Sequence, residues 1–381
     1  MDFALDPDVE TFRHEVRRFA TKSLAPHYQS DDRAGRLRAD LVPSLAEMGL
    51  TGLRIPPELG GQGASALLAG VVAEEVSRAD FNAAYIIIVT ALISDVLVRN
   101  ATPEQQARWL PGIAQGTSLP CLAVTEPGHG TDAATLEFKA VQDGDGWRLY
   151  GEKTSITLGL YANAGLVLAR TGGPGARGVS AFYVNLDDDL VTRAGFDDLG
   201  GRSNGRASLH FDGLRVTRDE LVGDLGAGFV SVMQGFDYSR AIIGLCCLGT
   251  AQAALDETLQ WARDRVAFGK PIGTFQGVAF PLAESATHVR GARLVCLEAL
   301  WKKDNGLEHS AEAAMAKFWA PKLSAEVIHR CLLTFGHMGY ASESPMGQRL
   351  RDVIGLEIGD GTEQVSKLII ARALLGREYA P

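Results

Sequence analysis

The sequence predicts an α+β protein in which a β domain is inserted between two helical domains. Apolar residues recur at helical spacing in residues 1–119, and this spacing returns in residues 226–381. Between them, in residues 120–225, short β-type runs are separated by turns rich in glycine and aspartate. No helical stretch separates these runs, which favours an antiparallel barrel or sandwich over a parallel sheet.

The first segment predicts five helices, at residues 9–24, 40–50, 67–80, 83–100 and 102–116. Asp6 or Asp8 can cap the first of them, and Gly49 is a typical stop for the second. The fourth is so apolar that we expect it to be buried. Thr102 and Pro103 mark the start of the fifth, because proline is tolerated at the first helical position.

The middle segment predicts strands at residues 120–132, 138–156, 164–172, 179–186 and 207–216. The last segment predicts long helices at residues 229–268, 276–306, 309–336 and 363–376. Gly306 is a plausible stop for the second of these. Pro321 should break or bend the third, because proline removes a hydrogen bond and crowds the preceding turn.

Composition narrows the functional classes. The formal net charge of −9 argues against nucleic acid or an anionic membrane as partner. The five cysteines are odd in number and lack metal-binding spacing, so we expect buried, reduced thiols and a cytoplasmic location. No signal peptide is expected at the N-terminus. No apolar run reaches about 18 residues, so no membrane span is expected. Because the cysteines lack metal-binding spacing, no metal site is expected either.

Three short stretches carry candidate chemistry. The turn in residues 122–132 presents backbone N–H groups with the hydroxyls of Thr125 and Thr131, which suits a phosphate or an oxygen-rich planar ligand. Arg265 and Lys270 flank Phe268 on a turn at the end of a predicted helix, and two cations with an aromatic face suit the phosphates and adenine of a dinucleotide. Asp360 precedes a predicted helix and could be a general base. Each stretch also has a structural interpretation, as an ordinary turn, a helix C-terminus or a capped helix start.

Taken together, these stretches resemble the acyl-CoA dehydrogenase family. 124-VTEPGHGTDAA is similar to the family's V-T-E-P-x-x-G-S-D pattern, and 153-KTSITLG to its K-x-[FW]-I-T-N-G strand. 335-FGHMGY and 350-LRDVIGLEIGDGTEQVSKLIIAR resemble its G-G-x-G-[YF] and R-D-x-x-x-x-x-I-Y-E-G-T-x-x-I-Q segments. No single motif is specific, but their joint order along almost the whole chain is.

The resemblance implies an N-terminal helical domain at 1–119, a central β-barrel domain at 120–225 and a C-terminal four-helix bundle at 226–381. It also implies FAD, an acyl-CoA substrate, a homotetramer and an electron-transfer flavoprotein as acceptor. Members of the family remove the α-proton of the thioester and pass the β-hydride to flavin N5. Such a weak acid needs a carboxylate base and hydrogen bonds to the developing enolate in a dry site.

The resemblance also assigns residues. Asp360 takes the position of the catalytic base. FAD contacts are implied for Leu122, Val124, Thr125, Gly130, Thr131, Ser155, Thr157, Leu333, Gly336, His337, Thr362 and Gln364, and, from a neighbouring subunit, for Arg265, Phe268 and Gln276. Substrate contacts are expected for Ile87, Asp237, Arg240 and Gly361.

The base position departs from the family, which usually has Glu there. Some members carry the base just before the arginine of the 236-FDYSR stretch, but Ser239 occupies that position and has no carboxylate. The missing methylene shortens the reach of Asp360 by roughly 1.5 Å and frees volume beside the α-carbon. Asp at this position resembles the subgroup acting on cyclohexane-1-carbonyl-CoA, so an alicyclic or α-branched acyl-CoA is the leading hypothesis.

Three alternatives stay open. One is an ordinary short-chain or branched-chain acyl-CoA dehydrogenase that tolerates Asp. A second is a different base, Asp95, although the sequence favours a helix-end cap or a satisfied polar group at this position. The third is a flavin-binding member of the family without dehydrogenase activity. It is motivated by Ser155 and His337, which replace the family's aromatic residue and glycine.

Overall fold

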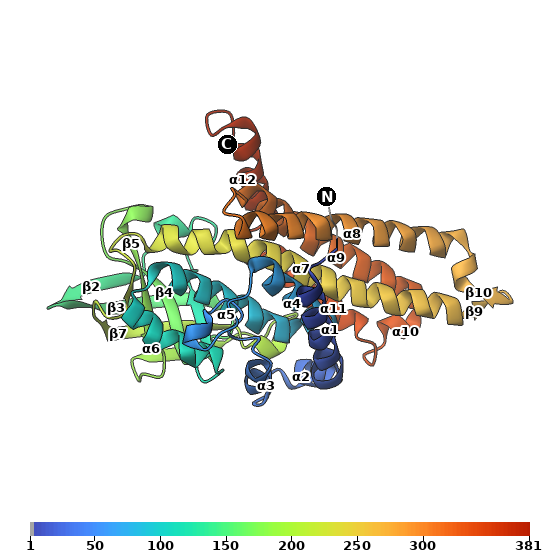
Figure 1. The fold of residues 1–381 in the computed structure, drawn as a ribbon, viewed down its shortest axis with the longest axis horizontal. Helices are drawn as coiled ribbons and strands as arrows, with labels where there is room; N and C mark the ends of the chain where they lie inside the picture. The colour runs from blue at the N-terminus through green and yellow to red at the C-terminus, as the bar shows by residue number, and fades with distance from the viewer. Residues whose placement is uncertain (1–3) are drawn as a thin grey trace.

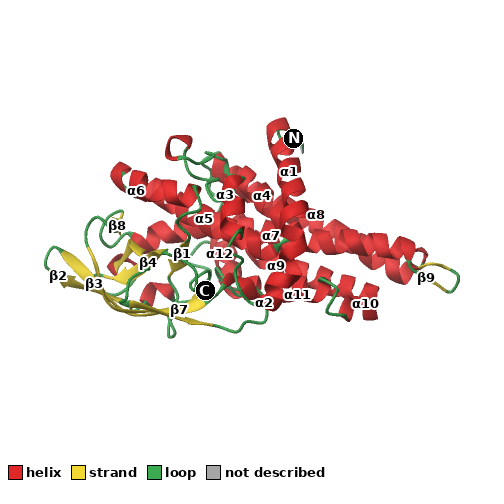
Figure 2. Cartoon of the chain, turned by 90° about the horizontal axis from the view of Figure 1, so that it is seen from below, coloured by secondary structure: helices red, strands yellow, loops and turns green. Residues whose placement is uncertain are grey.

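A computed structural model describes residues 4–381. Figure 1 shows a molecule with its β-sheet at one end of the long axis and a bundle of long helices reaching to the other. The N-terminal helices pack against the middle of the bundle. Seen from below, the sheet and the bundle again occupy opposite ends (Figure 2). The predicted α+β class with a β domain between helical parts is confirmed.

The N-terminal part contains α1 (Pro7–Phe19), α2 (Tyr28–Ala34), α3 (Leu41–Glu47), α4 (Ala66–Ala79), α5 (Phe81–Asn100) and α6 (Pro103–Ala114). Asp6 is the cap of α1, because its carboxylate accepts from the Asp8 N–H at 2.9 Å. Thr102 and Gln105 form a reciprocal capping box at the start of α6. The short α2 was not predicted, because its polar sequence shows no apolar periodicity.

The sheet consists of β1 (Pro120–Ala123), β2 (Lys139–Asp143), β3 (Gly146–Ile156), β4 (Ala164–Arg170), β5 (Val179–Asn185), β6 (Val191–Gly195), β7 (Ala207–Val216) and β8 (Leu221–Val222). Their order is β6-β7-β3-β2-β4-β5-β8, with β1 paired to β4. Most pairs are antiparallel, but β1 and β2 both lie parallel to β4.

The predicted barrel is wrong. Within residues 4–381 no ladder joins β6 to β8, so the sheet stays open. Closing a barrel requires the first and last strands to share a continuous hydrogen-bond ladder. The two-residue strand β8 offers too few backbone groups for one. Strand patterns predict the local conformation but not this long-range pairing.

The C-terminal part is built on α7 (Gly228–Asp264), α8 (Gln276–Asp304), α9 (Ser310–Phe335) and α12 (Glu363–Leu375), with the short α10 (His337–Tyr340) and α11 (Met346–Ile354). The hairpin of β9 (Val266–Ala267) and β10 (Lys270–Pro271) joins α7 to α8. Of the break or bend predicted at Pro321, the break is wrong, because α9 continues through this residue. Pro321 is buried and α9 packs against α7, α8 and α12, so tertiary packing outweighs the local cost.

Two helices, α5 and α7, are long and apolar enough to span a membrane by length and composition. Of their most apolar windows, 89% and 78% of residues are buried inside the fold. Their hydropathy is therefore accounted for by the core that they form between the other helices. The five cysteines are buried and free, as expected from the sequence.

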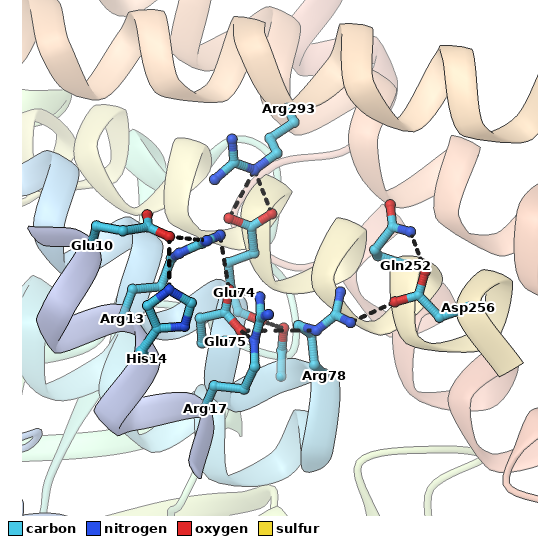
Figure 3. Close-up of polar contacts among 11 residues, drawn as sticks. Glu10, Arg13, His14, Arg17, Glu74, Glu75, Arg78, Gln252, Asp256 and Arg293 are labelled. Atoms are coloured by element: carbon cyan, nitrogen blue, oxygen red, sulfur yellow. Dashed lines mark hydrogen bonds and ion pairs between the residues drawn. The ribbon is translucent and has the colours of Figure 1, made fainter. Parts of the chain in front are cut away.

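Figure 3 shows how ion pairs tie the N-terminal helices to the bundle. Glu75 on α4 is 2% exposed and accepts two hydrogen bonds of 2.7 Å from Arg17 on α1. Its neighbour Glu74 accepts from Arg293 on α8 at 2.7 Å. These buried, paired carboxylates fix the position of α4 between α1 of the N-terminal part and α8 of the C-terminal bundle. This frame also fixes α5, which follows α4 directly and borders the candidate site.

Candidate active site

Asp360 lies in a tight turn that leads into α12. Its φ is +56°, and that of Gly361 is +103°. A left-handed conformation costs a non-glycine residue roughly 1–2 kcal/mol, and such strain concentrates at functional sites. The turn ends at Thr362, whose hydroxyl accepts from the Val365 N–H at 3.4 Å. The cap of α12 and the strained residue Asp360 therefore lie in one continuous turn.

Left-handed φ values mark several predicted site residues. Among the described residues, four that are not glycine have them: Ser155, Leu158, Phe268 and Asp360. Three of these are candidate site residues, and the fourth follows Thr157 directly. Asparagine, which the family has at the Leu158 position, adopts this conformation more readily than leucine does. The strain thus points to the same regions as the motifs.

Ser239 on α7 holds the carboxylate of Asp360. Its hydroxyl donates to Asp360 Oδ2 at 3.0 Å, and Ser239 is completely buried. The guanidinium of Arg240 donates weakly to the backbone oxygen of Asp360 at 3.4 Å. The sequence had only excluded Ser239 as a base. The structure gives it the role of orienting the shorter carboxylate that stands in place of Glu.

Lys317 on α9 is a site residue that the sequence analysis missed. Lys317 is 1% exposed, and its ammonium donates to the backbone oxygens of Leu356 at 2.7 Å and Gly361 at 2.8 Å. These bonds bridge the two ends of the segment that carries Asp360. The available signal was a lone lysine inside the otherwise apolar run 313-AAMAKFWA.

The electrostatics around Asp360 suit a base. Burial raises the pKa of Asp360 above its usual value, while Lys317, Ser239 and Arg240 act in the opposite direction. Catalytic bases are tuned in this way, because a raised pKa increases the drive to accept a proton. The three partners favour the ionised carboxylate, which is the form that accepts a proton.

A cavity of about 360 Å³ lies beside this turn, between the β domain and the C-terminal helices. Its lining residues are Phe81, Tyr85, Ser155, Thr157, Asp198, Leu199, Gly200, Gly201, Asn204, Arg206, Arg351, Asp352, Ile354, Gly355, Leu356, Ile358 and Gly359. Gly359 precedes Asp360 directly, and Ser155 and Thr157 are predicted flavin contacts. The volume and the hydroxyl lining fit a planar heteroaromatic ring held by a few polar groups.

The segment with Val124 and Thr125 is fixed against β3. The fully buried ammonium of Lys153 donates to the Val124 oxygen at 2.9 Å and pairs with Glu126 at 2.8 Å. The N–H of Thr154 donates to the Thr125 oxygen at 2.9 Å. Burial lowers the pKa of Lys153 to about 8, while Glu126 opposes this shift. Thr125 is therefore held next to the stretch that carries Ser155 and Thr157.

Five further predicted flavin contacts lie on β1, on the loop that follows it and at the start of α12. Leu122 is half-buried on β1, whereas Gly130 and Thr131 are exposed on the loop that follows. Thr362 and Gln364 lie at the start of α12, with Gln364 exposed. None of these five residues lines the cavity, so their predicted contact with FAD stays a prediction.

Arg206 occupies the space beside Ser155. Its guanidinium donates to Ser155 Oγ at 2.9 Å, forms a bidentate pair with Asp198, and stacks over Phe196 at 4.1 Å from the ring centroid. Ser155 stands where the family has an aromatic residue. In this chain the guanidinium of Arg206, which lies over the Phe196 ring, contacts the serine side chain. The edge of the cavity is consequently polar.

The remaining predicted FAD contacts lie elsewhere. Arg265, Phe268, Gln276, Leu333, Gly336 and His337 are all exposed, near the β9–β10 hairpin and α10. Figures 1 and 2 both place these elements at the end of the bundle far from the sheet. Phe268 is 94% exposed. One chain therefore does not bring this group together with the cavity.

The predicted substrate contacts divide in a similar way. Arg240 pairs with Asp237 at 2.7 Å, and Asp237 also accepts from Ser310 at 2.6 Å, close to the Asp360 turn. Gly361 is part of that turn. Ile87, by contrast, is completely buried and does not line the cavity. The face that α5 presents to the cavity carries Phe81 and Tyr85, a pair at i,i+4 spacing that the sequence analysis passed over.

Asp95, the alternative base, has three cationic partners. It contacts Arg99 at 2.8 Å, Arg54 at 3.0 Å and Lys303 at 3.2 Å. Burial alone would raise the pKa of Asp95, but Lys303, Arg99 and Arg54 overcome this and hold it below the usual range. A carboxylate so stabilised in its ionised form is a poor proton acceptor, which favours the structural interpretation.

Comparison with known proteins identifies acyl-CoA dehydrogenase domains along most of the chain. Family models of acyl-CoA dehydrogenase match the N-terminal domain at residues 6–117, the middle domain at 121–214 and the C-terminal domain at 226–375. The mitochondrial short-chain specific acyl-CoA dehydrogenase of Bos taurus is 35% identical over 369 residues, which is 96% of this chain and 90% of that protein.

Solved structures share the whole fold. The butyryl-CoA dehydrogenase of Megasphaera elsdenii superposes with a TM-score of 0.95 at 29% identity, covering 98% of this chain and 100% of that one. A chain from a structure reported for the electron transferring flavoprotein of Acidaminococcus fermentans gives 0.96 at 32%, with the same coverage. The fold, the site and these matches define an FAD-dependent oxidoreductase. The chain belongs to the acyl-CoA dehydrogenase family.

Proposed function

We propose that this acyl-CoA dehydrogenase acts on an alicyclic substrate such as cyclohexane-1-carbonyl-CoA and forms cyclohex-1-ene-1-carbonyl-CoA. The observation that carries the proposal is the short carboxylate of Asp360, held by Ser239 beside the cavity. Its missing methylene leaves room for a substituent on the α-carbon, which a ring requires. A carboxylate one bond shorter reaches a linear α-carbon less well.

The residues of this chain have separate tasks in the reaction. Asp360 removes the α-proton, and Arg240 and Lys317 keep its turn in place through backbone contacts. Thr125, Ser155 and Thr157 would hold the flavin ring at the cavity. FAD, when bound, supplies the acceptor for the β-hydride. Where the bound flavin and acyl group exclude water, the hydrogen bonds that stabilise the enolate are strengthened.

A short-chain or branched-chain acyl-CoA is the second candidate. It is favoured by the relatives, since the bovine protein is short-chain specific and the Megasphaera protein is a butyryl-CoA dehydrogenase. For this candidate, Asp360 would be tolerated rather than selected.

Anaerobic bleaching of the flavin distinguishes the two candidates. We expect cyclohexane-1-carbonyl-CoA to bleach the FAD-loaded protein faster than butyryl-CoA or isobutyryl-CoA does. Asp360→Glu restores the methylene and should shift the preference toward butyryl-CoA by about tenfold or more. Faster bleaching of the unaltered protein by butyryl-CoA would reject the alicyclic assignment.

We further propose a homotetramer that transfers electrons to an electron-transfer flavoprotein in the cytoplasm. The exposed group around Phe268 supports this assembly, because it could reach FAD only from a neighbouring chain. The Acidaminococcus match supports the acceptor. Sedimentation velocity tests the assembly: a monomer that binds FAD stoichiometrically would disprove the contribution of a second chain.

A further inference from the structure

A fixed cation lies at the edge of the cavity. Arg206 directly precedes β7, and it lines the cavity together with Ser155. Its guanidinium donates to Ser155 Oγ at 2.9 Å. Ser155 belongs to a bulge of β3, because the register against β7 shifts between Lys153 and Ile156. Bulges beside functional sites re-aim side chains, and this one directs Ser155 toward Arg206.

The guanidinium of Arg206 is held on two further sides. Its Nε donates to Asp198 Oδ2 at 2.8 Å, and one Nη completes a bidentate pair with the same carboxylate. The guanidinium carbon lies 4.1 Å from the centroid of the Phe196 ring. The Phe196 N–H also donates to the Arg206 backbone oxygen at 3.0 Å, which joins the two segments through the main chain. A guanidinium that is paired and stacked in this way is preorganised, and it stays protonated at any pH at which a protein works.

Arg206 retains donors for a ligand, whereas the other charges of the cavity wall are engaged elsewhere. The charged side chains among the described lining residues are Asp198, Arg206, Arg351 and Asp352. Arg351 pairs with Asp32 on α2 at 2.7 Å, and Asp352 accepts from the Tyr28 hydroxyl at 2.7 Å. Of the five N–H groups of the Arg206 guanidinium, three donate to Asp198 and Ser155, so two have no partner among the described residues.

This cation would lie against a flavin ring that fills the cavity. A hydride carries two electrons, so its acceptor becomes negatively charged, and a nearby cation stabilises that form more than the neutral oxidised ring. We propose that Arg206 is a flavin-tuning residue: its fixed guanidinium contacts the ring at the edge marked by Ser155 and raises the reduction potential of the bound FAD. The inference goes beyond the substrate proposed above and rests on the flavin ring occupying this cavity.

The size of the effect is set by the neighbours of the guanidinium. Asp198 offsets part of its charge, and the side chains of Arg206 and Asp198 are 33% and 21% exposed, so solvent screens part of the field. A charge within contact distance shifts a charge equilibrium by roughly ten- to a thousandfold, and we expect the lower end of this range here. A higher potential favours removal of the β-hydride, because it shifts the equilibrium between the thioester and FAD toward the reduced cofactor.

The test measures the midpoint reduction potential of bound FAD by spectroelectrochemistry. Arg206→Met removes the cation and leaves Asp198 unpaired, so the potential should fall by about 30 mV, a tenfold change for a two-electron couple. Asp198→Asn leaves the cation unopposed and should raise the potential. Arg202→Met is the matched control: Arg202 lies in the same connection between β6 and β7, contacts Asp197 at 3.7 Å and does not line the cavity, so the potential should stay unchanged.

The opposite directions of the two shifts separate tuning from support. Loss of a merely structural contact would weaken FAD binding in both variants, measured as the FAD dissociation constant, without moving the potentials apart. Potentials that move the same way, or that match the Arg202→Met control, would overturn the proposal. Should Arg206→Met fail to retain FAD, Asp198→Asn decides alone: a raised potential supports the proposal, and an unchanged or lowered one rejects it. If no ester bleaches the wild type, the proposed function fails, whereas the potentials still decide the role of Arg206 because they require no substrate.

Discussion

An Asp360→Ala variant loaded with FAD is expected to lose acyl-CoA-dependent bleaching by roughly a hundredfold to ten-thousandfold. This is the range that a positioned general base contributes. The variant should still fold, because burial raises the pKa of Asp360 and its ionised form therefore opposes folding near neutral pH. FAD content and thermal stability should consequently stay close to those of the wild type, and rapid anaerobic mixing with the best ester measures the loss.

Ser239→Ala is the matched control for this variant. It removes the 3.0 Å hydrogen bond to Asp360 but leaves the carboxylate in place. A loss about tenfold or smaller is expected, together with a higher pKa of Asp360, because Ser239 now lowers it. Normal bleaching by Asp360→Ala would show that another group removes the proton.

Local signals in the sequence predicted the parts of the fold that are local in origin. The caps at Asp6 and Thr102 are contacts within three residues, and the structure has both. The barrel and the break at Pro321 were wrong for one common reason. Sheet closure depends on strands far apart in the chain, and the continuity of α9 depends on its packing against three other helices.

The candidate site shows the same division. Asp360 could be found because its motif is contiguous, but its partners could not. Ser239 lies 121 positions away from it, and Lys317 lies 44 positions from Gly361. Tyr85 lies in an apolar helix from which the sequence indicated Ile87 instead, and Ile87 belongs to the core. Contiguous motifs indicate which residue reacts, and the packing of distant helices determines what tunes it and what shapes the substrate.

Replacing Lys317 with Met should both loosen the Asp360 turn and change its titration. The variant leaves the buried oxygens of Leu356 and Gly361 without their donor, and each such loss costs about 1–3 kcal/mol. It also removes the cation that most lowers the pKa of Asp360. Bleaching requires the ionised carboxylate, so it is present above this pKa and lost as the pH falls through it. The acid limb of the pH–rate profile should therefore move to higher pH.

Lys322→Met provides the comparison that isolates this effect. Lys322 lies on the same helix and pairs with Glu363 at 3.6 Å, but its side chain is 48% exposed. Exposed pairs contribute little, so neither stability nor the acid limb should change measurably. Lys317→Arg keeps the charge and should displace the limb less than Lys317→Met. If the limb stays fixed in Lys317→Met while stability falls, Lys317 supports the turn mechanically and the tuning of Asp360 comes from Ser239 and Arg240.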